Sequence, residues 1–303
     1  MNKRFLLEVN FDITPNAISM GQAQLDWYLN DSFTLVAGRF LTPIGSFNER
    51  LGPEWINKLP DVPIMFQQVV PLTSTDGVQL RGARYLGGLP VKIEYSFYAG
   101  NGFQLPQAAT TLTPVADLQG LTGGPDAVNA RAYGTRIGMW LPLCGVNFGF
   151  SGYTNGIFSP GTQNGYNLWD FDFNYHRGSW DFRTEFATNN QNTTPIIGHN
   201  ISRQGMYAQI AYRNYQSENR YLSRLESVFR YGFAAFNGID PKHLDMTVFG
   251  SPFSVPVSRD QFTLGLNYYF YPSMVLKLAY EINRERTFNL HDDVFFAQGV
   301  WAF

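Results

Sequence analysis

The chain has 303 residues and a formal net charge of −2, with 15% charged residues against 16% aromatic ones. The near-neutral charge gives no support for nucleic-acid binding, and the single cysteine, Cys144, excludes an intramolecular disulfide framework and a cysteine-rich metal site. No apolar run approaches 18 residues, so no transmembrane helix is expected. Few charges, many aromatic residues and a mean hydropathy near zero suit strands that alternate between lipid and water.

The first residues, MNKRFLL, begin like a signal peptide, but Glu8, Asn10 and Asp12 interrupt the apolar stretch before a hydrophobic core can form. We therefore predict a strand over 5–11. Beyond it the hydrophobic period is two nearly everywhere and almost never 3.6. The full set of expected strands, fourteen in all, is 5–11, 22–27, 33–41, 78–86, 91–99, 131–141, 146–153, 168–176, 180–188, 206–215, 223–233, 262–270, 274–283 and 293–303.

Short and long connections alternate along the chain. Tight turns such as Asn30-Asp31 and Gly87-Gly88 join the strands in pairs. Longer connections separate the pairs, near 43–76, 100–128, 154–166, 189–203, 234–259 and 284–292. Transmembrane barrels have this arrangement, with short periplasmic turns and long external loops. A soluble sandwich has no reason to sort its loops by length onto opposite ends.

Within the hairpins, aromatic and charged residues fall on opposite faces. Phe171 and Phe173 oppose Asp170 and Asp172, and the strand at 180–188 repeats the pattern. An aqueous lumen on one side and acyl chains on the other require such alternation. The buried face of a soluble sheet would carry more Val and Ile than Phe, Tyr and Trp. The prediction is an all-β, single-domain transmembrane antiparallel β-barrel over residues 1–303, with about fourteen strands.

The last strand, DVFFAQGVWAF, places Phe295, Trp301 and Phe303 on one side of an extended chain. A terminal strand that shows Trp and Phe to water invites edge pairing, whereas a lipid-facing strand carries them naturally. We expect it to close the barrel by pairing with the first strand, which is either residues 5–11 or a strand upstream of this sequence. Aromatic residues also gather at the short-turn ends, and these predict a girdle at the periplasmic interface: Trp140, Tyr175, Trp180, Tyr268, Tyr269, Tyr271 and Trp301.

Two parts of the sequence resemble known outer-membrane proteins. Gly38-Arg39-Phe40 and Pro43-Ile44-Gly45, within the run 6–50, resemble the early part of the phosphate-selective (O/P-type) porins. In those porins a strand ending in Gly-polar-Phe precedes a Pro and a loop that folds into the pore. The C-terminal strand, with Trp301 and Phe303, resembles the assembly signal of bacterial outer-membrane barrels.

The resemblance implies a bacterial outer-membrane porin that forms trimers. In the family a hairpin precedes the segment that resembles residues 6–11, which implies two missing strands and sixteen in the complete barrel. Export to the outer membrane also requires a leader, so the natural N-terminus is expected to lie upstream of this sequence.

The pore-lining candidates are the charged residues on the predicted inner face. The signs are nearly balanced, and because anion pores use rings of Arg or Lys, phosphate specificity is not expected. Ion pairs that brace the wall are the alternative for these residues. The set is Arg81, Lys92, Glu94, Arg136, Asp170, Asp172, Asp181, Arg183, Glu185, Arg213, Arg224, Glu226, Arg230, Lys277 and Glu281.

The long segment 43–76 is the candidate constriction loop, because a connection of that length in a compact protein usually has a function. One helical turn is expected near Pro53 to Lys58. Folding outward, or onto a neighbouring subunit, is the alternative. Its charged candidates are Glu49, Arg50, Glu54, Lys58 and Asp61.

Enzymatic function is not expected, and neither is a cofactor or a metal site. The four histidines, His176, His199, His243 and His291, are far apart and form no metal-ligand spacing. Asp170 and Asp172 share a face, but two acids on one strand are ordinary in a water-filled barrel.

The sequence therefore predicts an outer-membrane pore for passive diffusion of small hydrophilic solutes or ions, with weak charge selectivity. Its expected partners are the lipid bilayer, the solutes and further copies of the chain in a homotrimer. A structural or sheath-like barrel around a partner is one alternative, and filling of the lumen by residues 43–76 would favour it. A soluble all-β binding protein is the other.

Overall fold

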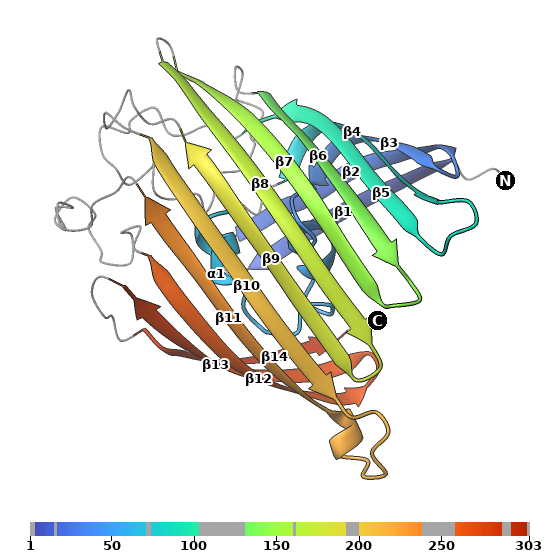
Figure 1. Cartoon of the computed structure of the whole chain (residues 1–303), viewed down its shortest axis with the longest axis vertical. Helices are drawn as coiled ribbons and strands as arrows, with labels where there is room; N and C mark the ends of the chain where they lie inside the picture. The colour runs from blue at the N-terminus through green and yellow to red at the C-terminus, as the bar shows by residue number, and fades with distance from the viewer. Residues whose placement is uncertain are drawn as a thin grey trace.

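The computed structural model describes residues 4–14, 17–70, 74–102, 131–159, 162–191, 200–237, 258–286 and 292–301. Its strands form one antiparallel sheet in which every strand pairs with its neighbours in the chain (Figure 1). The strands are β1 (Phe5–Thr14), β2 (Ala17–Asn30), β3 (Phe33–Leu41), β4 (Ser74–Tyr85), β5 (Lys92–Asn101), β6 (Arg131–Leu141), β7 (Val146–Ser159), β8 (Thr162–Arg177), β9 (Trp180–Gln191), β10 (Ile201–Arg213), β11 (Leu225–Asn237), β12 (Arg259–Tyr271), β13 (Met274–Glu285) and β14 (Val294–Trp301).

The fourteen strands confirm the predicted fold class and chain order. One predicted loop, 154–166, is wrong, because β7 and β8 stay paired as far as Ser159 and Thr162. Polar residues such as Thr154 and Asn167 face each other across this part of the hairpin. A strand segment that carries polar residues on both faces lacks the alternation of apolar and polar residues that identifies the rest of each strand.

β1 and β14 are the two edges of the sheet. β1 pairs with β2, and β14 pairs with β13 from Met274↔Trp301 to Glu281↔Val294. Of the two partners expected for the closing strand, residues 5–11 do not pair with β14 among the described residues. Phe303, the last residue of the predicted assembly signal, lies outside those residues, whereas Trp301 is 73% exposed on β14.

The two faces of the sheet differ as the alternation predicts. On β8, Trp169 and Phe171 are about half exposed on the outer face, whereas Asp170 and Asp172 are buried on the inner face. An apolar outer face and a polar inner face suit a barrel in lipid. The girdle prediction is wrong at Trp140, which contacts Lys92 of the inner face, and at Tyr269, which contacts inner-face Glu226.

Residues 42–70, which we call the inner segment, lie inside the curled sheet (Figure 1). The segment contains a single π-helical turn, η1 (Phe47–Leu51), and the short helix α1 (Ile64–Gln68). At the predicted helical turn, the Pro53 carbonyl accepts hydrogen bonds from Ile56 N (2.8 Å) and Asn57 N (2.9 Å). A 3₁₀ turn, η2 (Leu222–Arg224), precedes β11. No helix in the described ranges is long and apolar enough to cross a membrane.

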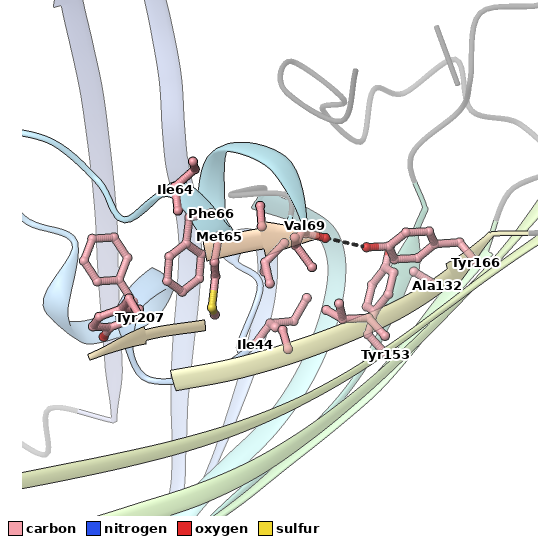
Figure 2. Close-up of a cluster of buried hydrophobic side chains, with 14 of the residues drawn as sticks. Ile44, Ile64, Met65, Phe66, Val69, Ala132, Tyr153, Tyr166 and Tyr207 are labelled. Atoms are coloured by element: carbon pink, nitrogen blue, oxygen red, sulfur yellow. Dashed lines mark hydrogen bonds between the residues drawn. The ribbon is translucent and has the colours of Figure 1, made fainter. Parts of the chain in front are cut away.

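The hydrophobic core lies between the inner segment and the inner wall. Met65 and Val69 pack among inner-face tyrosines that include Tyr153, Tyr166 and Tyr207 (Figure 2). The Tyr166 hydroxyl donates to the Val69 carbonyl at 3.2 Å. Apolar burial of this kind is the main source of packing stability, so part of the interior is a protein core, which Phe40 of β3 and Tyr98 of β5 also join.

Candidate pore

Basic side chains of β9, β11 and β13 bind the backbone of the inner segment. Lys277 Nζ donates to the carbonyls of Glu54 (2.5 Å) and Asn57 (2.6 Å). Arg230 reaches the Asp61 carbonyl at 2.9 Å, and Arg183 reaches the Ile56 carbonyl at 3.3 Å. Hydrogen bonds from charged donors are stronger than neutral ones, and the segment's irregular backbone offers many carbonyls that need partners.

A second contact joins Lys58 of the segment to Glu226 of β11. Lys58 Nζ lies 2.6 Å from Glu226 Oε1, and Asn267 donates to the Lys58 carbonyl at 2.8 Å. The Tyr269 hydroxyl donates to the other oxygen of Glu226 at 2.8 Å. The buried Glu226 carboxylate therefore has partners in Lys58, Asn267 and Tyr269, which a buried charge requires.

Glycines on the inner wall make room for the segment. A Cβ atom on Gly205 of β10 would lie 2.9 Å from both Met65 Cβ and Val69 Cγ2. A Cβ on Gly265 of β12 would lie 2.3 Å from Leu59 Cδ2. Because real Cβ atoms keep larger distances, a side chain on Gly205 would displace Met65 at its Cβ, and one on Gly265 would displace the end of the Leu59 side chain.

The start of the segment lies against buried carboxylates of β8 and β9. Glu185 Oε2 accepts hydrogen bonds from Phe47 N (3.2 Å) and from the Ser46 hydroxyl (3.3 Å). Gly45 has φ +60° and a Cβ there would collide with Glu185, so glycine serves both the backbone and the close approach. In the described part of the chain, no group of three or more His, Cys, Asp or Glu residues is arranged to hold a metal.

Between part of the segment and β2–β6 there is a cavity of about 1070 Å³. It lies toward the end of the sheet where the short turns are, because the turn residues Asn30 to Ser32 line it. Glu49 and Arg50 of the inner segment also line it. Its charged lining residues are Arg4, Arg50, Arg81, Lys92 and Arg136 and the acids Asp31, Glu49 and Glu94.

Most cations of this cavity are paired with nearby carboxylates. Arg81 NH2 lies 2.6 Å from Asp26, a buried residue of β2, and Arg136 NH2 lies 2.9 Å from Asp172. Arg50 NH1 lies 2.5 Å from Glu94. Burial by itself would lower the pKa of Arg50, but attraction to Glu49 and Glu94 raises it above the ordinary value. Arg50 is therefore a permanent cation in the cavity.

The structure divides the predicted charged residues between these two sides. Arg81, Lys92, Glu94 and Arg136 line the cavity, together with Glu49 and Arg50 of the segment. The others contact the segment, lie next to it or form ion pairs near it, and these are Asp170, Asp172, Asp181, Arg183, Glu185, Glu226, Arg230, Lys277, Glu281 and, in the segment, Glu54, Lys58 and Asp61.

Two predicted residues lie at the short-turn end instead. Arg213 packs over the ring of Tyr269 with its guanidinium carbon 4.0 Å from the ring centroid. Arg224 lies in the η2 turn, so it precedes β11 and is not in the strand. The expected strand from Ser223 therefore begins two residues too early. His176 lies in β8, whereas His199, His243 and His291 are outside the described residues.

Sequence reasoning missed Asp26 and the inner-face tyrosines. The alternation of Gln22, Gln24 and Asp26 places Asp26 on the polar face of its strand, and this signal could have identified it as an inner-face residue. Tyr153 and Tyr166 carried no such signal, because tyrosine is as common on a lipid-facing surface as in a core.

An apolar outer face, a polar inner face and a curled sheet of sequential antiparallel strands define a transmembrane β-barrel. Solved structures share this fold. A loop-deletion variant of OmpT, an outer-membrane protein of Vibrio cholerae, matches with a TM-score of 0.59 at 11% identity over 98% of this chain and 85% of that chain.

Two further structures are similar. The outer-membrane channel DcaP of Acinetobacter baumannii has a TM-score of 0.58 at 10% identity, over 97% of this chain and 76% of that one. The structure of a porin has a TM-score of 0.51 at 9% identity, over 98% of this chain and 90% of that one. No protein-family model and no curated protein matches the sequence. These likenesses confirm the predicted transmembrane β-barrel fold, and they do not show that the chain belongs to the phosphate-selective porins.

Proposed function

We propose that the chain is an outer-membrane porin that lets small hydrophilic solutes and ions diffuse passively between the inner segment and the β2–β6 wall. The observation that carries the proposal is the cavity of about 1070 Å³, lined by charged residues of both signs. Water-filled barrels with polar interiors are the usual architecture of such pores. The trimer is part of this proposal, and so is the absence of enzymatic activity.

The inner segment is the proposed constriction loop. It occupies the side of the interior next to β9–β13 and presents Glu49 and Arg50 to the remaining space. Five basic residues line that space against three acids, but Asp26 and Asp172 each neutralise one of the arginines. Charge selectivity is therefore expected to be weak, as the near balance of the sequence indicates.

A structural barrel is the second candidate, and one observation favours it. The inner segment buries Ile64, Met65 and Val69 in a dry core and is bonded to several strands of the wall. A filled interior is what a plugged or bracing barrel would have. The open cavity beside the segment favours the pore over this alternative.

Bilayer recordings distinguish the two. Purified protein in planar membranes should conduct, with a reversal potential in a salt gradient that shows only a mild preference for one ion. Well-folded protein that inserts without conducting would reject the pore and leave the structural barrel.

A further inference from the structure

The cavity contains one continuous row of alternating charges. From β2 it runs Asp26, Arg81, Glu49, Arg50 and Glu94, and it ends at Lys92 of β5. Three carboxylates and three cations make a row with no net charge. Such a row offers no overall attraction to a simple anion or cation, but it offers closely spaced partners of both signs.

Glu49 is the loosely bound member of the row. Its carboxylate oxygens are 3.8 Å from Arg81 NH1 and 3.8 Å from Arg50 Nε, which is too long for a hydrogen bond. Its two neighbours are held tightly on their other sides, Arg81 by Asp26 at 2.6 Å and Arg50 by Glu94 at 2.5 Å. The place where the row can exchange partners is therefore between Arg81 and Arg50.

The cations beside Glu49 are accessible. The side chain of Arg50 is 41% exposed and that of Arg81 is 32% exposed, while Glu49 is 18% exposed. A solute with both an ammonium and a carboxylate could satisfy Glu49 and one of the arginines at once. A solute with one charge would satisfy only one sign and leave the other group without its partner.

We propose that this row is a transient binding site for small zwitterions, such as free α-amino acids. The inference rests on the proposed pore and names the class of solute that it favours. Glu49 would receive the ammonium group, and Arg81 or Arg50 would receive the carboxylate. Because the cations and acid are partly exposed, the site is weak, as passage through a pore requires.

Four solutes of nearly equal size test the proposal in proteoliposomes. Alanine carries both charges, lactate only the carboxylate, alaninamide only the ammonium, and lactamide neither. At low solute concentration alanine should enter about threefold faster than lactamide, which is the scale of one partly exposed ion pair. Glu49→Gln should bring this ratio close to one and raise lactate entry relative to alaninamide.

Asp31→Asn is the matched control, because Asp31 lines the same cavity but is not in the row. It should leave the alanine-to-lactamide ratio unchanged. Equal entry of alanine and lactamide into liposomes that contain the wild-type protein would overturn the zwitterion site but not the pore. A fall of the alanine-to-lactamide ratio in Asp31→Asn as large as that in Glu49→Gln would do the same. Exclusion of all four solutes would overturn the pore and the site together.

Discussion

The inner faces of β10–β13 and of the short-turn ends of β2–β6 belong to one sheet, yet they face different interiors. On β10–β12 small residues such as Gly205 and Gly265 meet apolar side chains of the inner segment, and Lys277 of β13 binds its backbone. On β4 and β5, Arg81 and Lys92 face an open, charged cavity. A small residue lets the inner segment approach the wall, whereas long charged residues favour a water-filled space beside the wall. The position of the proposed pore within the barrel therefore follows from side-chain size.

The largest effect on this contrast is expected from Met65→Ala. Met65 is fully buried between the inner segment and the wall, so truncation leaves a cavity and should lower the free energy of unfolding by about 2–5 kcal/mol. Denaturant unfolding in detergent measures it. The control is Leu264→Ala on the outer face of β12, where Leu264 is 55% exposed. Equal losses for the two variants would show that the filled side is not a core.

Gly205→Val tests the same contact between the inner segment and the wall, with the change made in the wall. The new side chain would meet Met65 and Val69, and overpacking of this kind costs about 1–3 kcal/mol. We expect a lower unfolding midpoint and noisier single-channel currents, because the segment would be pushed toward the cavity. Gly299→Val on β14 is the matched control, since a Cβ there would meet nothing within 4 Å. A quiet, stable Gly205→Val channel would contradict the close contact.

Lys277→Met removes the ammonium that binds the carbonyls of Glu54 and Asn57. Leaving buried carbonyls without a donor costs about 1–3 kcal/mol. The Glu54–Asn57 turn should loosen, and open-channel conductance should fluctuate more than in wild type. Lys92→Met removes an equal charge from the cavity wall without touching the segment backbone, so it should change ion preference while leaving the fluctuations at the wild-type level.

The smallest effect on stability is expected from Arg50→Gln. Its ion pair with Glu94 is partly exposed, so the loss should be under about 1 kcal/mol. The variant removes one permanent cation from the cavity and should shift the reversal potential toward cation preference. Arg220→Gln alters the η2 turn region outside the cavity and should leave the potential unchanged. An unchanged potential in Arg50→Gln would place the ion path elsewhere.

The sequence predicted the strands because lipid and water impose a period of two, and this is why Asp170 and Phe171 were assigned to opposite faces correctly. Where both faces of a strand are polar, as at Thr154, the period disappears and the strand was mistaken for a loop. The pairing of inner-face charges with the segment was beyond local pattern, because Lys58 and Glu226 are far apart in the chain. In the sequence, Gly205 and Gly265 look like ordinary strand glycines. The need for a small residue there appears only when the inner segment packs against them.

Thiol modification of the two walls tests the position of the pore most directly. Ala83 lines the cavity, whereas Ala211 is buried beneath Leu59 on the filled side. In a background in which the exposed Cys144 is replaced by Ser, each alanine is changed to cysteine and a charged methanethiosulfonate is added during single-channel recording. Conductance should fall in Ala83→Cys and stay constant in Ala211→Cys. Block in Ala211→Cys without block in Ala83→Cys would show that ions pass on the side assigned here to the core.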